Sequence, residues 1–366
     1  MFAVVAVAGL ILSLAGSTQA HDDKTDTKPG EKVERSLVVD AGATVTLCVA
    51  SGTLQVRGWE KSEIRVRSLD ATQIDFRRID KIKDKPPSRI DVMVLNKSTS
   101  TNPKFDCQAI ADVEMEVPAG ATVQVQTRDG DIVIAGVAGA YAGSQNGDIA
   151  IERATKLVEA GSVGGSIVLK DSTGRINLSS AGGGVEASNI RAASEDDTFD
   201  VGTVSGDIQL DRVSNPKVTA KTVNGTMTMT GPLAKSGWYG FTNMTGNIVL
   251  AMPHDASFQL NAKVSDRHNI VSEFNLKYLS DATPPPPPAV IKPKTPEAKG
   301  KTPEAKGKTP APTPQPVPKA GPVIAPIVVG KPMPAYVLRR VSAVCGSGDA
   351  TISIASFGGT VRLKKI

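Results

Sequence analysis

The chain has 366 residues, a formal net charge of +5, 4 % aromatic residues and 34 Gly. This composition predicts a thin core with closely stacked backbones, because few large rings are available to fill a thicker one. The basic charge is uneven: residues 284–334 hold 8 Lys and 2 Glu, a net of +6, which leaves −1 for the remainder. A nucleic-acid-binding domain would gather its basic residues on a folded face, so this distribution argues against nucleic acid as a partner.

The first 20 residues have the pattern of an export signal. Residues 2–14 form an uncharged apolar run, and Thr18 and Ala20 then precede a charged stretch. The pattern predicts a signal peptide of residues 1–20 that is cleaved before His21. The alternative is an uncleaved membrane anchor, although the run is short for a span of roughly 20 residues. We expect an exported protein, located in the periplasm, at the cell surface or in the medium, with membrane contact only through this segment if it is uncleaved.

The region before residue 127 predicts irregular β structure. Residues 21–35 are polar and charged, which predicts a disordered leader. From Ser36 the apolar residues alternate with polar ones, as in strands with one solvated face. The charged stretch of residues 75–85 interrupts this alternation and predicts a helical turn or a loop. We interpret 36–127 as β structure that is less regular than the sequence that follows.

Three cysteines follow the predicted cleavage site, namely Cys48, Cys107 and Cys345. In an oxidising compartment two of them could form a disulfide and leave one thiol free. Cys48 and Cys107 both lie in strand-like runs of the N-terminal region, so they are the preferred pair. The alternative is that all three are small buried side chains. Their spacing fits no zinc-binding pattern.

A short phrase recurs between Thr127 and Leu250. It consists of Ser, Thr or Asn, two residues, Gly, one residue, and two apolar residues spaced by one, with a weaker copy around Gly183. The steps from Gly to Gly are 17, 18, 18, 23, 19 and 21 residues, and such a periodicity is the mark of a repeat protein. The repeat turn glycines of the six stronger copies are Gly130, Gly147, Gly165, Gly206, Gly225 and Gly246.

Each repeat predicts two short strands and two turns. Gly, often next to Asp or Asn, predicts a tight turn because these residues tolerate a positive φ. The two apolar residues after it point to the same side of a strand, and one unit cannot bury that side without its neighbours. We therefore predict an all-β fold, a β-solenoid like a single-stranded β-helix, with stacked repeats of about 18 residues and internal apolar ladders. A β-sandwich built of hairpins is the alternative.

The C-terminal third changes character at residue 284. Residues 284–334 contain 17 of the 25 Pro, a density that favours extended polyproline II and predicts a disordered Pro/Lys-rich linker or insertion. Residues 335–366 return to a strand pattern. We therefore predict a β-strand repeat domain over 36–283, completed or capped by terminal strands from 335–366.

Several of these segments resemble a known family. Residues 115–120 and 127–132, the early segment 52–60 and the closing segment 348–354 are similar to the strands of the bacterial putative adhesins. That group consists of exported β-strand repeat domains, mostly without an assigned function. The resemblance covers about 35–280 and 335–366. It implies a β-solenoid domain outside the cytoplasm, and it offers adhesion as an analogy.

Residues that could carry chemistry are sparse. The three His have no ligand-like spacing, and no nucleophile elbow, phosphate loop or nucleotide fingerprint occurs. Asp131, Asp148 and Asp207 occupy the same place in three repeats, where adjacent carboxylates could bind a cation such as Ca²⁺ or act on a polysaccharide. The equivalent residues in other repeats are Ser166, Gly184, Thr226 and Asn247, a mixture that is typical of solvent-facing turns. We therefore predict turn formation there, and no catalytic residue, metal or cofactor.

Three functions remain open from the sequence. The preferred one is a non-enzymatic exported scaffold, an adhesin or cell-envelope interaction protein that presents a solenoid surface to a glycan, a protein or an envelope polymer. A wall-associated structural protein that acts through the Lys/Pro segment is the first alternative. A carbohydrate-active β-helix enzyme is the second, and it would need carboxylates that converge in one groove.

Overall fold

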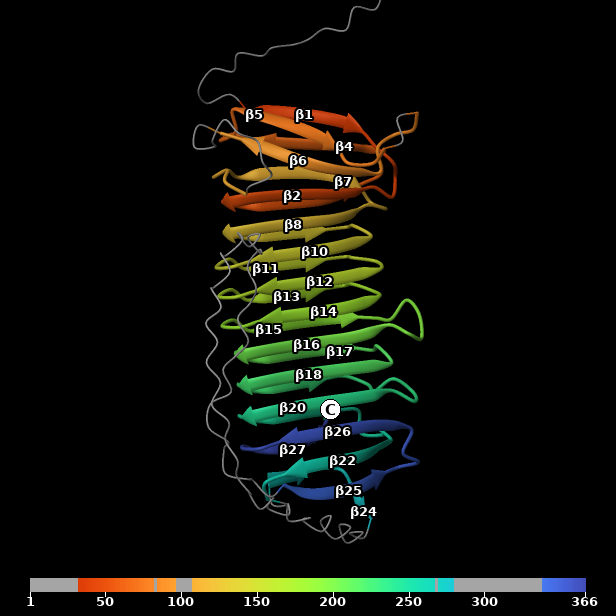
Figure 1. Ribbon diagram of the computed structural model, residues 1–366. Coiled ribbons are helices and arrows are strands. Elements are labelled where there is room, and N and C mark those ends of the chain that lie inside the picture. The colour runs from red at the N-terminus through yellow and green to blue at the C-terminus, as the bar shows by residue number, and fades with distance from the viewer. Residues whose placement is uncertain (1–31, 82–83, 97–106, 267–268, 280–337) are drawn as a thin grey trace, which may run out of the picture. The chain divides into compact units, whose positions relative to one another are not determined.

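A computed structural model describes residues 32–81, 84–96, 107–266, 269–279 and 338–366. The signal peptide, most of the leader and the Pro/Lys-rich segment of the sequence analysis lie outside these residues. The chain falls into two compact units, residues 1–147 and 148–366. The described regular structure of both units is β, which confirms the all-β solenoid prediction, and each unit contains two sheets with runs of parallel strands (Figure 1). Among the described residues, no helix has the length and apolar character needed to span a bilayer.

The first unit contains ten strands, in chain order: β1 (Val33–Val38), β2 (Thr44–Ser51), β3 (Leu54–Trp59), β4 (Glu63–Ser68), β5 (Gln73–Arg78), β6 (Arg89–Leu95), β7 (Val113–Pro118), β8 (Thr122–Asp129), β9 (Ile132–Ala135) and β10 (Gly139–Ser144). One sheet has the order β1-β4-β7-β3-β9 and the other β10-β8-β2-β6-β5. The pairs β3–β7, β3–β9, β2–β8, β2–β6 and β8–β10 are parallel. Antiparallel strands β1, β4 and β5 lie at the outer end of these sheets, where they cover the first parallel strands.

The second unit contains seventeen strands, in chain order: β11 (Ile149–Glu152), β12 (Leu157–Ser162), β13 (Ile167–Lys170), β14 (Arg175–Ser180), β15 (Val185–Ile190), β16 (Thr198–Ser205), β17 (Ile208–Val213), β18 (Lys217–Asn224), β19 (Met227–Thr230), β20 (Trp238–Thr245), β21 (Ile248–Met252), β22 (Phe258–Val264), β23 (Ile270–Ser272), β24 (Lys277–Tyr278), β25 (Arg339–Cys345), β26 (Ala350–Ser356) and β27 (Val361–Lys365). From β11 to β20 the odd-numbered strands belong to one sheet and the even-numbered strands to the other. Each coil therefore contributes one strand to each sheet.

Apolar ladders fill the space between the two sheets of the second unit. The first inward position carries Ile149, Ile167, Val185, Ile208, Met227, Ile248 and Val361 in register. All of these side chains are buried. The opposite sheet contributes a matching row: Val158, Ile176, Phe199, Val218, Tyr239, Ile352 and Leu260. Most of the inward side chains are aliphatic, in keeping with the low aromatic content of the chain.

The last strands of the chain form an inner coil of the second unit. Strand β26 lies between β20 and β22 in one sheet, and β27 lies between β21 and β23 in the other, all in parallel (Figure 1). The outer end of the first of these sheets is instead covered by antiparallel β25 and β24. The terminal strands predicted over 335–366 therefore take both places, with β26 and β27 inside the stack and β25 beyond β22. The reason is that β26 and β27 have apolar residues on their inward side that match the ladders of neighbours on both sides.

The repeat turn glycines form a column of close backbone contacts. In the second unit, a Cβ on Gly206 would overlap the carbonyl of Gly183, and a Cβ on Gly225 would overlap the carbonyl of Gly206. In the first unit the same holds for Gly147 over Gly130 and Gly130 over Gly52. Positive φ, the explanation offered by the sequence, holds in this column for Gly52 and Gly246 but not for the other five repeat turn glycines. Glycine is required here because successive backbones approach too closely for any side chain.

Buried hydroxyl groups connect this glycine column from coil to coil. The Oγ of Ser180 accepts a hydrogen bond from the amide of Gly183 in its own turn (3.0 Å) and donates one to the carbonyl of Gly165 in the preceding coil (2.8 Å). Ser144 repeats both bonds in the first unit, and Thr203 repeats the bond to the preceding coil in the second. At Ser144 and Ser180 the hydroxyl three residues before Gly therefore satisfies buried backbone groups in two coils at once, whereas the equivalent hydroxyl of Thr127 has no partner among the described residues.

The left-handed backbone conformation lies at the other bend of the coil. Arg153, Asp171, Asn189 and Arg212 have φ of 53°, 49°, 55° and 51° at equivalent places in successive coils. Their side chains are linked between coils: the Nδ2 of Asn189 donates to Asp171 (2.9 Å), and the Nε of Arg212 donates to Asn189 (2.6 Å). Asp and Asn tolerate this conformation better than most residues do, and the links between neighbouring coils help to hold it.

Two further expectations for the N-terminal region need correction. The stretch 75–85 is not wholly a turn or loop, because β5 extends to Arg78 and pairs antiparallel with β6. Ile74 supplies the buried contact that holds this charged strand to the core. The predicted leader of residues 21–35 is also too long, because Val33 is buried and pairs with Ser68 in β1 and β4. A range of 36–283 for a single domain stays a prediction.

The glycine column predicts a sharp difference between two glycines of the same coil. Gly206→Ala should destabilise the protein by about 3 kcal/mol, because the new methyl group forces neighbouring coils apart. Gly202→Ala is the matched control, since a Cβ there meets only ordinary van der Waals contact. Urea denaturation measures both variants. Equal stabilities would contradict the close-approach explanation.

The hydroxyl column predicts a second contrast, on strand β14. Ser180→Ala should lower the free energy of unfolding by about 1–3 kcal/mol, because it leaves the buried amide of Gly183 without its acceptor. Ser180→Thr retains the hydroxyl and should cost less. Ser179→Ala, at the exposed neighbouring position, should change little. Thermal unfolding followed by circular dichroism provides the comparison, and a loss in Ser179→Ala as large as that in Ser180→Ala would refute it.

Candidate functional site

The three aspartates singled out from the sequence are exposed residues at the repeat turns. The Oδ1 of Asp148 accepts a hydrogen bond from the amide of Ser166 in the next coil, and Asp207 accepts one from the amide of Thr226, both at 2.7 Å. Asn247 accepts the equivalent bond from the amide of Thr360 at 3.0 Å. These side chains therefore link neighbouring turns, and an amide oxygen can replace the carboxylate in that role.

Nothing in the described part of the chain gathers metal ligands. No group of three or more His, Cys, Asp and Glu side chains lies close enough there to hold an ion. His254 is exposed, and the other two His lie outside the described residues. Asp131 belongs to the first unit, and Asp148 and Asp207 belong to the second. The Ca²⁺ alternative raised by the repeat has no further support in these positions.

The cysteines are divided as a pair and a single thiol. Cys48 on β2 and Cys107 form a disulfide with a Cα–Cα distance of 5.0 Å, which is the pair preferred from the sequence. The bond fixes the segment that leads into β7, where backbone hydrogen bonds such as that from Ala50 to Ala109 also hold it beside β2. Cys345 is free, and its thiol donates to the carbonyl of Ala256 at 3.5 Å. The disulfide therefore helps to position β7 and its outward carboxylates.

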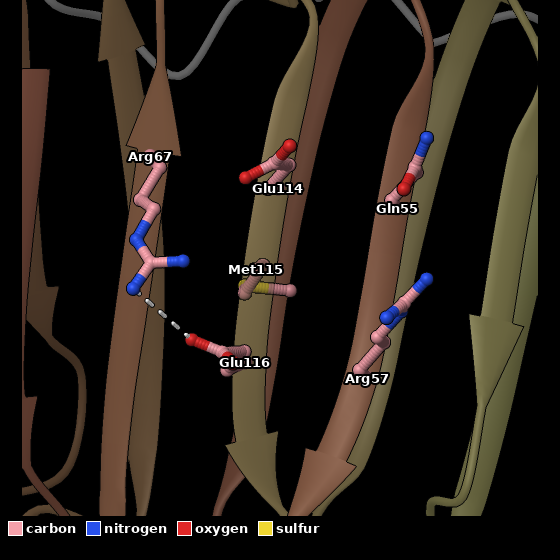
Figure 2. Close-up of a pocket in the computed structure, with 6 residues that line it drawn as sticks. All are labelled: Gln55, Arg57, Arg67, Glu114, Met115 and Glu116. Atoms are coloured by element: carbon pink, nitrogen blue, oxygen red, sulfur yellow. Dashed lines mark ion pairs between the residues drawn. The ribbon is translucent and has the colours of Figure 1, made fainter. Parts of the chain in front are cut away.

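A shallow depression lies on the outer face of one sheet in the first unit (Figure 2). It is lined by side chains of three neighbouring strands: Gln55 and Arg57 of β3, Glu114, Met115 and Glu116 of β7, and Arg67 of β4. Its volume is about 160 Å³. Pockets that enclose organic ligands generally measure about 300–1,000 Å³, so this one can accept only a small group or part of a larger ligand.

Most of the charged side chains around this depression form ion pairs. Glu116 pairs with Arg65 and lies 3.8 Å from a guanidinium nitrogen of Arg67 (Figure 2). Arg67 also pairs with Glu34 at 2.8 Å, and Glu114 pairs with Lys32 at 2.9 Å. The network crosses β1, β4 and β7, the strands at which parallel pairing changes to antiparallel pairing. Its main role is therefore to hold these strands in register.

Glu114, on the edge of the depression, is not suited to act as a proton donor near neutral pH. A hydrogen bond from Lys32 and its positive charge lower the pKa of Glu114 below its usual range, and the charges of Arg67 and Arg57 add to this. A glycosidase acid needs the opposite, a carboxyl whose raised pKa keeps it protonated near neutral pH. Glu114 therefore remains ionised. Arg57 makes no ion pair with a described residue, so it is the group of the depression best placed to meet an anion.

Trp59 marks the rim of the same charged surface. The guanidinium carbon of Arg65 lies 4.7 Å from its ring centroid and the ammonium of Lys61 lies 4.9 Å away, and the indole nitrogen donates to the carbonyl of Glu63 at 2.8 Å. The ring of Trp59 therefore already has cationic partners, and its N–H group already has a hydrogen-bond acceptor. The alternating charges of β4 are visible in the sequence, but their pairing with Glu116 depends on a register that the sequence does not show.

The role of the turn aspartates leads to a stability prediction. Asp207→Asn should leave the melting temperature nearly unchanged, because the amide oxygen still accepts from Thr226, as Asn247 does in its own turn. Asp207→Ala should cost roughly 1 kcal/mol because that bond is lost. Added Ca²⁺ should shift neither value. A melting temperature that rises with Ca²⁺ in the wild type but not in Asp207→Asn would instead establish a cation site.

Comparison with solved structures finds several similar folds. The chain is similar to a putative adhesin from Parabacteroides merdae ATCC 43184, with 11 % identity, 61 % of this chain and 90 % of that chain covered, and a TM-score of 0.39. It is also similar to a putative adhesin and a putative lipid binding protein from Parabacteroides distasonis ATCC 8503. Their identities are 12 % and 14 %, they cover 61 % of this chain and 91 % and 90 % of their own, and their TM-scores are 0.35 and 0.36. These values are too low to transfer a function.

A family assignment follows from the sequence match. None of the curated proteins compared with the chain matches it. The sequence model of a family described as Toastrack DUF4097 matches residues 52–268, which is more than half of the chain. That range contains the glycine and hydroxyl columns described above, and the match confirms the resemblance to the bacterial putative adhesins. The chain belongs to the Toastrack DUF4097 family.

Proposed function

We propose that the protein is a non-enzymatic, exported scaffold with an adhesin-like role, which presents the outer faces of its β-solenoid to a ligand of the cell envelope or cell surface. The stacked coils hold outward side chains at regular intervals of about 4.8 Å across each sheet. Such a surface suits an extended ligand that makes many separate contacts. The apolar run of residues 2–14 supports export, and the disulfide of Cys48 and Cys107 suits an oxidising compartment.

One observation carries the proposal: the turn aspartates Asp148 and Asp207 bond to the backbone of the next coil, while the outward strand positions remain at the surface. Glu114 and Glu116 pair with basic residues of neighbouring strands. Outward strand positions alternate with buried ones along nearly every coil, so their side chains are accessible without any change in the fold.

The names of the similar solved structures agree with this proposal without establishing it. Two are named putative adhesin and one putative lipid binding protein. An adhesin-like role requires a surface ligand, whether a glycan, a protein or an envelope polymer. The Lys/Pro-rich residues 284–334 offer a second route to the wall, but they lie outside the described residues.

Binding assays with the predicted mature chain, residues 21–366, test the proposal. On an array of glycans and envelope proteins, we expect at least one ligand to be retained by a variant that lacks residues 284–334 and by Asp148→Asn with Asp207→Asn. Loss of all binding on deletion of 284–334 would favour the wall-associated alternative. Incubation with polysaccharides should release no new reducing ends. Release that disappears in the double Asp→Asn variant would establish a carbohydrate-active enzyme and overturn the proposal.

A further inference from the structure

Five neighbouring strands of the second unit form a cationic surface. They lie in one sheet in the order β18-β20-β26-β22-β25, and we call their outward side the Trp238 face (Figure 1). The outward positions of these strands carry four cations, namely Lys217, Lys221, Lys263 and Arg340, and no Asp or Glu. Such a concentration of one charge contrasts with the first unit, where acidic and basic side chains alternate in ion pairs. A surface of this kind raises the local concentration of anionic ligands.

The cations of the Trp238 face lie in a regular arrangement. Lys221 shares a row across the sheet with Lys263 and Arg340, through the register of Thr242 and Ala355 between them. Strand spacings of about 4.8 Å place Lys221 about 14 Å from Lys263, and Arg340 directly beside Lys263. All three side chains are exposed, and none makes an ion pair with a described residue. The row therefore offers positive charge at both ends of a strip that is long enough for several ligand units.

Trp238 lies within this cationic surface. Its indole covers Gly240, where a Cβ would overlap the six-membered part of the ring. The residue is nevertheless 38 % exposed, and the ammonium of Lys217 on the adjacent strand lies 5.8 Å from the ring centroid. Because one side of the indole rests on Gly240, which has no side chain, the ring lies along the sheet and exposes an apolar face to solvent beside a positive charge.

Small side chains that can form hydrogen bonds surround the exposed indole of Trp238. In the sheet register, Thr351 flanks Trp238, while Thr219 and Ser353 flank Gly240 on the two neighbouring strands. Farther along, the Oγ of Ser342 donates to the Oδ1 of Asn261 at 3.3 Å, which leaves the amide nitrogen of Asn261 available. The Trp238 face therefore combines an exposed ring, hydroxyl and amide groups, and cations on one side of the sheet.

We propose that the Trp238 face binds an anionic polysaccharide whose sugar rings carry carboxylates. The C–H side of a sugar ring packs on the indole, the sugar hydroxyls exchange hydrogen bonds with Ser and Thr side chains, and the carboxylates pair with Lys221, Lys263 and Arg340. This inference rests on the proposed function, because it names the ligand class and the surface that an adhesin-like scaffold would use. A lipid surface is a poorer match, since the ring lies along the sheet and does not protrude from it.

Polygalacturonate is the probe, and the predicted mature chain, residues 21–366, is the protein. Calorimetry at low ionic strength should show binding, with at least tenfold weaker affinity for Trp238→Ala and for Lys221→Gln with Lys263→Gln. The Lys variant should also show a smaller dependence of affinity on salt. Trp238→Phe should fall between the wild type and Trp238→Ala. Lys170→Gln, an exposed lysine on β13 of the opposite sheet, is the matched control and should bind like the wild type.

The outcomes separate this inference from the proposed function. Unchanged affinity in the Lys221→Gln, Lys263→Gln variant, whose melting temperature serves as the folding control, would overturn the inference. Equal or tighter binding to vesicles of anionic lipid or to single-stranded DNA would overturn it as well, by showing charge without sugar recognition. If the wild type ignores polygalacturonate but binds another ligand on the array, only the inference fails. If it binds no ligand at all, the proposed function fails with it.

Discussion

The close approach of successive glycine backbones is the constraint on which the rest of the solenoid depends. In each unit, a turn glycine of one coil lies against the carbonyl of the equivalent glycine in the preceding coil, with no room for a Cβ. The buried hydroxyl three residues earlier can then bond to the glycine amide of its own coil and the glycine carbonyl of the preceding one, as Ser180 does. With the turn fixed in this way, the apolar residues after Gly fall into register and form the internal ladders.

Regular stacking has a direct consequence for function. Since the inward positions and the turns are occupied by packing and backbone hydrogen bonds, recognition falls to the outward positions of the strands. The two surfaces described differ in how they use these positions. Around Glu116 the charges neutralise one another and stabilise the change from parallel to antiparallel pairing. On the Trp238 face the charges have one sign, and insertion of β26 between β20 and β22 makes the surface wide enough for an extended ligand.

Errors in the sequence-based predictions have identifiable physical causes. A glycine at a turn signals either positive φ or close approach, and the sequence alone cannot distinguish them. In this repeat close approach applies at the turn glycines and positive φ at few of them, while Asp171 and Asn189 have a positive φ at the opposite bend. The sequence does not reveal the charged strand β5, because its single fully buried residue, Ile74, is surrounded by charged side chains that face solvent. The sequence predicts that the terminal strands complete or cap the domain, and their exact place inside the stack depends on partners far away in the sequence.

The sequence by itself determined the repeat, the all-β class, the inward ladder positions and the family resemblance, because each follows from short-range periodicity within about 18 residues. It also favoured the pair of Cys48 and Cys107 and the turn role of the aspartates. Only the tertiary structure decided which coils are neighbours where strands from the end of the chain lie between earlier strands. It therefore decided which outward side chains share a surface. Lys263, Arg340 and Trp238 lie far apart along the chain, and they meet on one face because β26 and β25 pair with β22 across a long intervening segment. Such pairing is set by the burial of complementary apolar sides, which local sequence patterns do not encode.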